Sequence, residues 1–149
     1  MKLWKALGGG LAGATILTLI HETARRINPD APRMDLLGMR AIAKLMQGAG
    51  EAPPDDRGLH NLAMAGDMIS NTLYYSLVGA GKKNAVWARG AGLGLSAGIG
   101  GVVLPGPLGL GKQPSGRTNQ TKAMTIAWYL AGGLVAAAVS HLLADPGKK

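Results

Sequence analysis

Four polar side chains share one face of an apolar stretch, residues 59–80, and they are the residues best placed to do chemistry. His60, Asp67, Asn71 and Tyr74 lie seven, four and three residues apart, which puts them on one side of a helix. A helix over this stretch is long enough to cross a hydrocarbon layer of about 30 Å. A carboxylate facing lipid costs on the order of 3 kcal/mol at the centre of such a helix, so we predict that this face turns toward protein or trapped water.

Asp67 is the strongest candidate on this polar face. As a carboxylate inside a membrane it could bind a cation or relay protons, with Asn71 and Tyr74 extending the path. The alternative is structural: Asp67 would be protonated or hydrogen-bonded and would hold helices together. The sequence leaves both interpretations open, and it places no second acidic residue inside any predicted span.

His21 and His60 are predicted to lie at the same end of the molecule, one closing an apolar span and the other opening the next. Facing imidazoles could ligate haem, a pigment or a metal ion; the alternative is two interfacial histidines that contact headgroups or loops. His141 is predicted at the opposite end and cannot complete such a site. A zinc-protease motif is excluded, because the position four residues after His21 is Arg25. No cofactor or metal is assigned.

A glycine-rich loop is the remaining candidate for chemistry. Gly106 and Gly111-Lys112 match the first part of a P-loop, but Gln113 stands where Ser or Thr should hold magnesium, and Pro114 follows it. Nothing else resembles a nucleophile–base set or a pair of catalytic carboxylates. We predict no catalytic residues and a protein that is not an enzyme.

The elements that must position these residues are four apolar blocks separated by polar connections. The chain of 149 residues is enough for one domain, residues 1–149. We predict an all-α fold: an integral membrane four-helix bundle with one interfacial amphipathic helix between spans 1 and 2. The predicted spans are about 3–20, 59–80, 87–104 and 122–143, and the amphipathic helix is about 33–47. The first span also resembles a signal peptide, with a basic start and an apolar centre.

Small residues recur every four positions in three of the spans. Each glycine costs a soluble helix about 1 kcal/mol relative to alanine, whereas in a membrane such rows let helix backbones approach closely. The positions predicted to pack helices together are Gly9, Gly13, Gly90, Gly94, Gly98, Gly132 and Gly133. A further row on the third span is Gly92, Ser96 and Gly100, and the fourth span carries two rows, Gly132–Ala136–Ser140 and Gly133–Ala137.

The net charge of +8 predicts anionic partners. Nucleic acid is one class and phospholipid headgroups are the other; basic residues that border apolar spans favour lipid. Arg33, Arg40 and Lys44 line one side of the amphipathic helix and are predicted to contact lipid headgroups. The alternative is a helix that packs on a soluble partner.

Four spans place both termini on one side of the membrane. Residues typical of the membrane interface fall toward that side: Trp4, Tyr74, Tyr75 and Trp87. Its basic residues lie beside spans or in a short loop, and they include Lys148 and Lys149. The positive-inside rule gives short loops the most weight, so this side is predicted to be cytoplasmic.

Residues 89–111, RGAGLGLSAGIGGVVLPGPLGLG, are followed by a fourth apolar span. This plan resembles uncharacterised small four-helix bacterial inner-membrane proteins, the YagU-like group, which share glycine-rich first and third spans and a long loop with proline. The resemblance covers the general plan of the chain. It implies a bacterial inner membrane and carries over no site residues.

We therefore expect a non-enzymatic membrane protein that is an accessory or assembly subunit of a larger membrane complex or a homo-oligomer. The alternative function is a small-solute, ion or proton transporter or channel lined by the polar face of residues 59–80. A second alternative is a haem- or pigment-binding membrane subunit that uses His21 and His60. The expected partners are the phospholipid membrane and other membrane subunits or copies of the chain, with no nucleic acid.

Overall fold

The computed structural model describes residues 2–144, and within that range every regular element is a helix. The helices are α1 Leu3–Ile27, α2 Met34–Gly48, α3 Asp56–Ser76, α4 Val86–Val103, the single turn α5 Gln113–Gly116, and α6 Asn119–Leu143. Two 3-10 turns, Leu77–Gly79 and Lys83–Ala85, join α3 to α4. The all-α class predicted from the sequence is confirmed. Lys148 and Lys149, which the sequence placed on the cytoplasmic side, lie outside the described residues.

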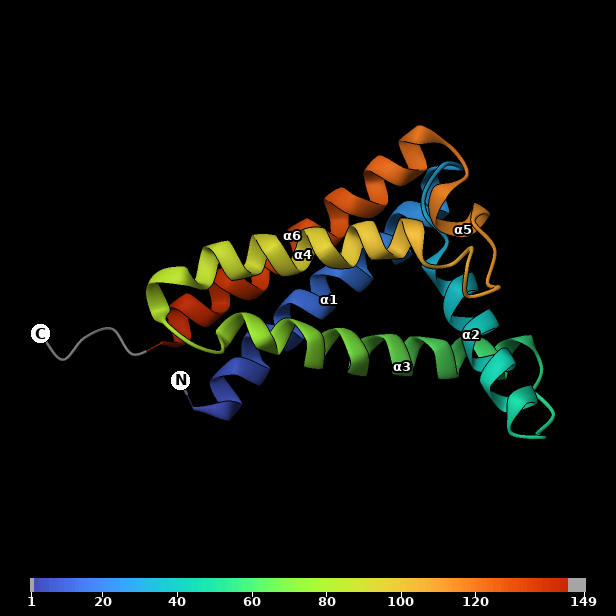
Figure 1. Cartoon of the computed structure of the whole chain (residues 1–149), viewed down its shortest axis with the longest axis horizontal. Helices are drawn as coiled ribbons and strands as arrows, with labels where there is room; N and C mark the ends of the chain where they lie inside the picture. The colour runs from blue at the N-terminus through green and yellow to red at the C-terminus, as the bar shows by residue number, and fades with distance from the viewer. Residues whose placement is uncertain (1, 145–149) are drawn as a thin grey trace, which may run out of the picture.

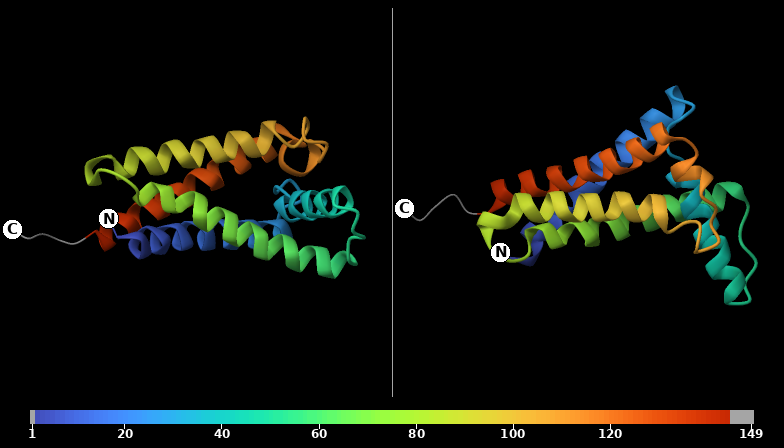
Figure 2. Two further views of the ribbon diagram at one scale, coloured as in Figure 1. Left: turned by 60° about the horizontal axis from the view of Figure 1, so that its bottom comes forward. Right: turned by 45° about the horizontal axis from the view of Figure 1, so that its top comes forward.

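The four helices α1, α3, α4 and α6 run along the length of the molecule (Figure 1). α1 begins and α6 ends at one end of the molecule, and α2 and α5 lie at the other end. α6 packs against both α1 and α4, and α1 also packs against α3. Contact between α3 and α4 is slight, and Figure 2 shows these two helices diverging toward the end where α2 lies.

α1 is longer than the first predicted span, because it continues past residue 20 to Ile27. The polar residues do not interrupt the helix, since Arg25 donates to the Glu22 carboxylate one turn earlier, at 3.0 and 2.6 Å. The helix ends just before Pro29, where the preceding residue takes the extended backbone that proline favours. His21 and Glu22 are therefore carried by α1 and not by a connection.

Local signals fix where the other long helices begin. Asp55 caps α3 by accepting a hydrogen bond from the Gly58 N–H at 2.9 Å, and Thr118 caps α6 by accepting one from the Thr121 N–H at 3.0 Å. Gly81, with φ of +91°, turns the chain between α3 and α4 in a conformation that glycine adopts freely.

Close packing of α6 against its neighbours depends on glycine. A Cβ atom built at Gly13 of α1 would lie 2.6 Å from the carbonyl oxygen of Gly132, and one at Gly90 of α4 would lie 2.5 Å from that of Gly133. These spacings leave no room for a side chain, so the helices meet backbone to backbone. The Gly132 row of α6 therefore faces α1, and the Gly133 row faces α4. Similarly close approaches occur at Gly9, Gly94 and Gly98.

α2 lies across the end of the molecule opposite to the start of α1 and packs against α3 and α5. Arg40 donates Nη1 to the carbonyl oxygen of Leu110 at 2.7 Å, and Lys44 donates Nζ to that of Leu108 at 2.6 Å. Arg33 forms an ion pair with Asp35 of α2. Headgroup contact by these three basic residues stays a prediction, and the structure gives each of them a partner within the chain.

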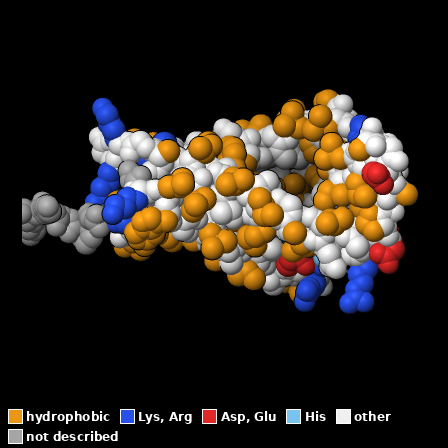
Figure 3. All heavy atoms as spheres, turned by 90° about the horizontal axis from the view of Figure 1, so that it is seen from below, with side chains coloured by type: hydrophobic (Ala, Val, Ile, Leu, Met, Phe, Trp, Pro, Cys, Tyr) orange, Lys and Arg blue, Asp and Glu red, His pale blue; other side chains and the backbone are white. Residues whose placement is uncertain are grey.

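Many bulky apolar side chains are exposed between the two ends of the molecule. Exposed side chains on the long helices include Leu11, Leu19, Ile69, Leu73, Leu95, Ile99 and Leu134. Figure 3 shows apolar side chains along the length of the molecule, with Lys and Arg gathered toward the two ends. Within residues 2–144, α1 and α6 are the two helices whose length and apolar composition are sufficient to cross a membrane.

Candidate functional site

Asp67 lies midway along α3 and is half-buried. Asn71, one turn later, donates Nδ2 to the Asp67 Oδ1 atom at 2.9 Å, so the two side chains form a local pair on one helix face. No Lys or Arg of the described chain forms an ion pair with Asp67. The carboxyl group is therefore held by an amide and not by a cation.

A small cavity of about 20 Å³ adjoins this carboxyl group. Four helices contribute to its lining: Thr18, His21 and Glu22 from α1, Met34 and Asp35 from α2, Ala63, Met64 and Asp67 from α3, and Tyr129 from α6. A cavity needs about 10–15 Å³ to hold one water molecule, so this one can hold a single water. Asp67 is not the only acidic residue at this place, because Glu22 and Asp35, which lie outside the predicted spans, line the same cavity.

His21 is buried, with 7% of its surface exposed. Its Nδ1 atom lies 2.9 Å from the carbonyl oxygen of Leu17, and its ring packs edge-on against Trp128 and Tyr129 of α6 at 5.1 and 5.8 Å between centroids. These contacts fix the ring so that Nε2 is left without a protein hydrogen-bond partner. The Thr18 hydroxyl is likewise buried without a partner, so two orphan polar groups accompany the cavity. A water there would satisfy groups whose burial otherwise carries a desolvation cost.

Asp35 and Glu22 each form an ion pair with an arginine that is close in the sequence. Arg33 donates Nε and Nη2 to the two carboxylate oxygens of Asp35 at 2.9 and 2.7 Å, and Arg25 holds Glu22 in the same two-pronged way. Burial alone would raise the pKa of Asp35, but the hydrogen bonds and charge of Arg33 outweigh it and hold the pKa below its ordinary value. Asp35 therefore carries a negative charge at neutral pH.

The polar face of α3 also borders a wide groove between α3 and α4. Tyr74 donates its hydroxyl to the carbonyl oxygen of Leu93 at 3.0 Å, which ties α3 to α4 where the helices begin to separate. Beyond this bond the groove encloses about 580 Å³ and is visible as the hollow in Figure 3. Asp67 and Asn71 line it on the α3 side, and small residues such as Ser96 line it on the α4 side. Asp67 thus lines both the small cavity and the groove.

His60, the first member of the predicted polar face, is not among the residues that line the small cavity or the groove. The structure therefore gives His21 and His60 no common cavity in which both imidazoles could hold one haem or pigment. Among the residues described, no group of three His, Cys, Asp or Glu side chains is placed to hold a metal ion. His141 lies at the opposite end of the bundle, beside Trp87.

Glu22 and Asp35 were not predicted as site residues. Glu22 lies just past the predicted end of the first span, and Asp35 lies in the predicted amphipathic helix, whose basic side alone was assigned a role. One signal was present: Thr18, His21 and Glu22 are three and four residues apart, so they share a face if α1 continues past residue 20. No comparable signal brings Asp35 to this place, because its position depends on how the start of α2 folds against the bundle.

Comparison of the chain with models of protein families, with curated proteins and with solved structures finds no match. The resemblance to the YagU-like group stays a prediction.

Proposed function

We propose that the chain is an integral membrane protein whose four long helices cross the bilayer, and that it is a non-enzymatic accessory or assembly subunit. One observation carries this proposal: many bulky apolar side chains of the long helices are exposed, while the contacts between these helices are made largely by glycine, alanine and hydroxyl side chains. In water, burial of apolar surface is the main driving force for folding, and this arrangement would forgo much of it. In lipid, close backbone packing and hydrogen bonds between helices take its place.

The contacts of α1 favour a permanent membrane span over a removable signal peptide. Ala14 and Leu17 are 0% and 1% exposed within the bundle, and Gly13 meets the backbone of α6. Removing α1 would expose these contacts on both α3 and α6. With four spans, both ends of the chain lie on one side of the membrane, and we propose the cytoplasmic side of a bacterial inner membrane.

The groove between α3 and α4 is the surface at which we propose that a neighbouring subunit binds. The Gly90–Gly94–Gly98 row is already used against α6, so it cannot also receive a partner. The second row of α4 is open: Gly92 and Ser96 are exposed, and nothing lies within 4 Å of a Cβ atom built at Gly92. Small residues in an open groove accept a transmembrane helix from another subunit or a second copy of the chain.

Single-cysteine cross-linking tests this surface, because the chain has no cysteine of its own. Ser96→Cys, in the groove, is expected to cross-link to a neighbouring subunit in native membranes through 4-maleimidobenzophenone. Its maleimide couples to the new thiol, and its photoactivated ketone bonds to a C–H group of any adjacent chain. Leu134→Cys, at an exposed position on α6 outside the groove, is the matched control and is expected to remain uncoupled. Resistance of the chain to extraction by alkaline carbonate is measured first.

Three outcomes count against these proposals. Release of the chain by carbonate contradicts membrane integration. Equal cross-linking at the two positions, or none at Ser96→Cys in a chain that stays in the membrane, contradicts the groove as the association surface.

The position of Asp67 favours a second candidate function, passage of protons or cations. Its carboxyl group lines the one-water cavity on one side and the open groove on the other. A water in the cavity could join Asp67 to the unpaired Nε2 of His21 and the Thr18 hydroxyl. Such a chain of polar groups inside a membrane protein is typical of ion and proton pathways.

Flux measurements in proteoliposomes with an enclosed pH-sensitive dye test this candidate. Asp67→Asn keeps an oxygen for the Asn71 amide but cannot carry a proton, so flux is expected to fall to the level of empty vesicles. Asp56→Asn, which removes an exposed acid at the start of the same helix, is the control and should keep wild-type flux. Wild-type flux no greater than that of empty vesicles, or full flux in Asp67→Asn, contradicts the pathway.

A further inference from the structure

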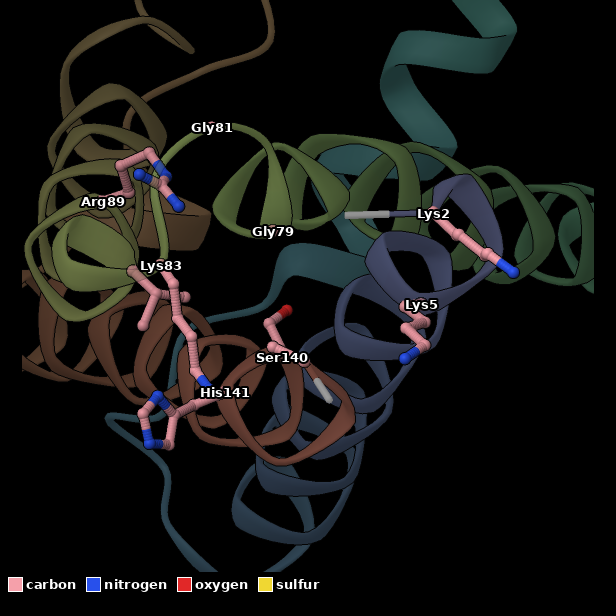
Figure 4. A pocket seen from close by; sticks show the side chains of 10 residues that line it. Lys2, Lys5, Gly79, Gly81, Lys83, Arg89, Ser140 and His141 are labelled. Carbon is pink, nitrogen blue, oxygen red and sulfur yellow. The ribbon is translucent and has the colours of Figure 1, made fainter. Parts of the chain in front are cut away.

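A second cavity, of about 490 Å³, opens at the end of the molecule opposite to α2. It lies where α1 begins, α6 ends and the connection from α3 to α4 crosses between them. Figure 4 shows Lys5 of α1 and the preceding Lys2 on one side of this opening and Lys83, Arg89 and His141 on the other. The volume falls within the range of about 300–1,000 Å³ that is common for small-molecule sites. We call this cavity the basic pocket.

Among the described residues that line the basic pocket, the charged side chains are all positive. Four of the lining residues are Lys or Arg, and none of the described residues that line it is acidic. Positive side chains from separate parts of the chain are brought together here by the fold: two precede or open α1, one lies in the connection after α3, and one lies in α4. Such convergence concentrates positive potential in a concave site, where an anion is attracted more strongly than at a flat surface.

Arg89 is held in place at the rim of the pocket. Its Nε atom donates to the carbonyl oxygen of Val78 at 2.9 Å, and Nη1 donates to that of Lys82 at 2.9 Å. A guanidinium has five N–H donors in a rigid fork, so these two bonds orient the group and leave donors on Nη2. A pre-oriented guanidinium is well suited to the oxygens of a phosphate.

Ser140 supplies a second, independent indication of a ligand. The residue is 1% exposed, lines the pocket, and has a buried hydroxyl with no hydrogen-bond partner in the part of the chain that is described. A serine inside a helix can bond back to the carbonyl oxygen four residues earlier, and Ser140 does not. Figure 4 shows its hydroxyl directed into the space between α1 and the α3–α4 connection. A bound acceptor would satisfy this donor.

If the long helices cross a membrane as proposed above, the pocket lies at the level of the headgroup layer. Trp4 and Trp87, at this end of the bundle, are 60% and 48% exposed, and exposed tryptophans in membrane proteins gather at the interface between lipid and water. Basic pockets between membrane helices at this level bind anionic lipid headgroups.

We propose that the basic pocket binds a phosphate group, supplied by the headgroup of an anionic phospholipid or by a soluble phosphate ester. Arg89 and the lysines provide charge-assisted hydrogen bonds to the phosphate oxygens, and the Ser140 hydroxyl donates one more. The pocket lies at the opposite end of the bundle from Arg33, Arg40 and Lys44. The inference is independent of the proposed subunit role, and binding of inorganic phosphate would not require a membrane.

Native mass spectrometry of the full chain in neutral detergent provides the test, with titrations of phosphatidylglycerol, phosphatidylcholine and inorganic phosphate. The pocket variant is Lys2→Gln/Lys83→Gln. Its control is Lys82→Gln/Lys112→Gln, which removes the same charge from exposed lysines that do not line the pocket. Loss of one charge-assisted hydrogen bond weakens binding about tenfold or more, so we expect at least that loss in the pocket variant and no change in the control.

The titrations also distinguish the two sources of phosphate. Preference for phosphatidylglycerol over phosphatidylcholine, without binding of inorganic phosphate, assigns the site to lipid. Binding of inorganic phosphate that the pocket variant weakens, and that displaces phosphatidylglycerol, assigns it to phosphate itself, including a soluble ester.

Three results overturn the proposal. They are equal binding of the two lipids with no binding of inorganic phosphate, equal losses in the pocket and control variants, and unchanged affinity in Ser140→Ala. The last variant changes no charge and removes a single hydroxyl, so it tests the proposal even if the double variant fails to fold. Size-exclusion elution and helical circular dichroism verify the fold of each variant.

Discussion

Two glycines on α4 allow the steric cost of close helix packing to be measured apart from the helix propensity of alanine. Gly94 faces α6, where a Cβ atom would lie 2.8 Å from Leu130 Cα and 2.8 Å from the carbonyl oxygen of Tyr129. Gly92, two residues earlier on the same helix, has nothing within 4 Å of the equivalent point. Replacement by alanine gains about 1 kcal/mol of helix propensity at either position, so the difference between the two variants isolates the steric cost.

The size of that cost follows from the atoms that the new methyl group meets at Gly94. Ordinary contact with a Cβ atom begins at 3.4 Å, so a spacing of 2.8 Å requires α4 and α6 to move apart. The neighbouring atoms belong to the backbone, and no change of side-chain rotamer can relieve the overlap. Overpacking of this kind costs about 1–3 kcal/mol. We expect Gly94→Ala to be less stable than Gly92→Ala by that amount, and Gly92→Ala to be at least as stable as the wild type.

Reversible unfolding in mixed micelles, with increasing dodecyl sulfate and circular dichroism as the signal, measures this difference. The wild type and the two alanine variants are compared in the same detergent, so that contributions common to their free energies of unfolding cancel. If the two alanine variants have equal free energies of unfolding, or Gly94→Ala is the more stable, then α4 and α6 do not meet backbone to backbone at Gly94 and the packing argument fails.

Three further predictions concern hydrogen bonds and charge. Tyr75→Phe removes a 2.7 Å bond from a fully buried hydroxyl to the carbonyl oxygen of Tyr129, and the same titration should show a loss of about 0.5–1.5 kcal/mol. Arg40→Gln frees the Leu110 carbonyl and should speed amide hydrogen exchange in residues 105–111; unchanged exchange would mean that Arg40 does not hold this loop. The folded-state pKa of Asp35 is lowered, so the stability that it contributes is complete above its unfolded pKa of about 3.9 and is lost as the pH falls through the lower folded value. Asp35→Asn should therefore flatten the loss of stability on acidification below about pH 4, and an unchanged acid profile would contradict the ion pair.

The positions of the helices could be predicted from the sequence because local signals determine them. Apolar blocks gave the four long helices, and the amphipathic pattern of residues 33–47 agrees with α2 to within one residue at each end. The end of α1 was misplaced because a change from apolar to polar residues was treated as the end of a helix. Polarity changes what surrounds a helix, whereas Pro29 prevents it from continuing.

The candidate site was only partly predictable, since it combines residues whose spacing in the sequence is unrelated. Asp67 and Asn71 were found because they share a face of one helix. Glu22 and Asp35 reach the same cavity from two other helices, and that proximity depends on the crossing of α1 and α3 and on the fold of the start of α2. The basic pocket could not be predicted for the same reason. From the sequence, its lysines were used only to predict the orientation of the chain in the membrane.

The open groove follows from the distribution of small residues among the helices. α6 has two rows of small residues, and α1 and α4 occupy one each. α3 packs closely against α1 at Gly10, which lies against the backbone of α3 at Thr72. The glycine in the middle of α3, Gly66, has nothing within 4 Å of a Cβ position, so no small-residue contact draws α3 toward α4. The long side chain of Tyr74 spans the gap instead, by its bond to α4. A transmembrane helix with a small-residue row of its own could pack on Ser96, which lines the groove, and on Gly92 one turn earlier, where a Cβ atom would meet nothing. This open row is the reason that we propose the groove as the surface for a partner.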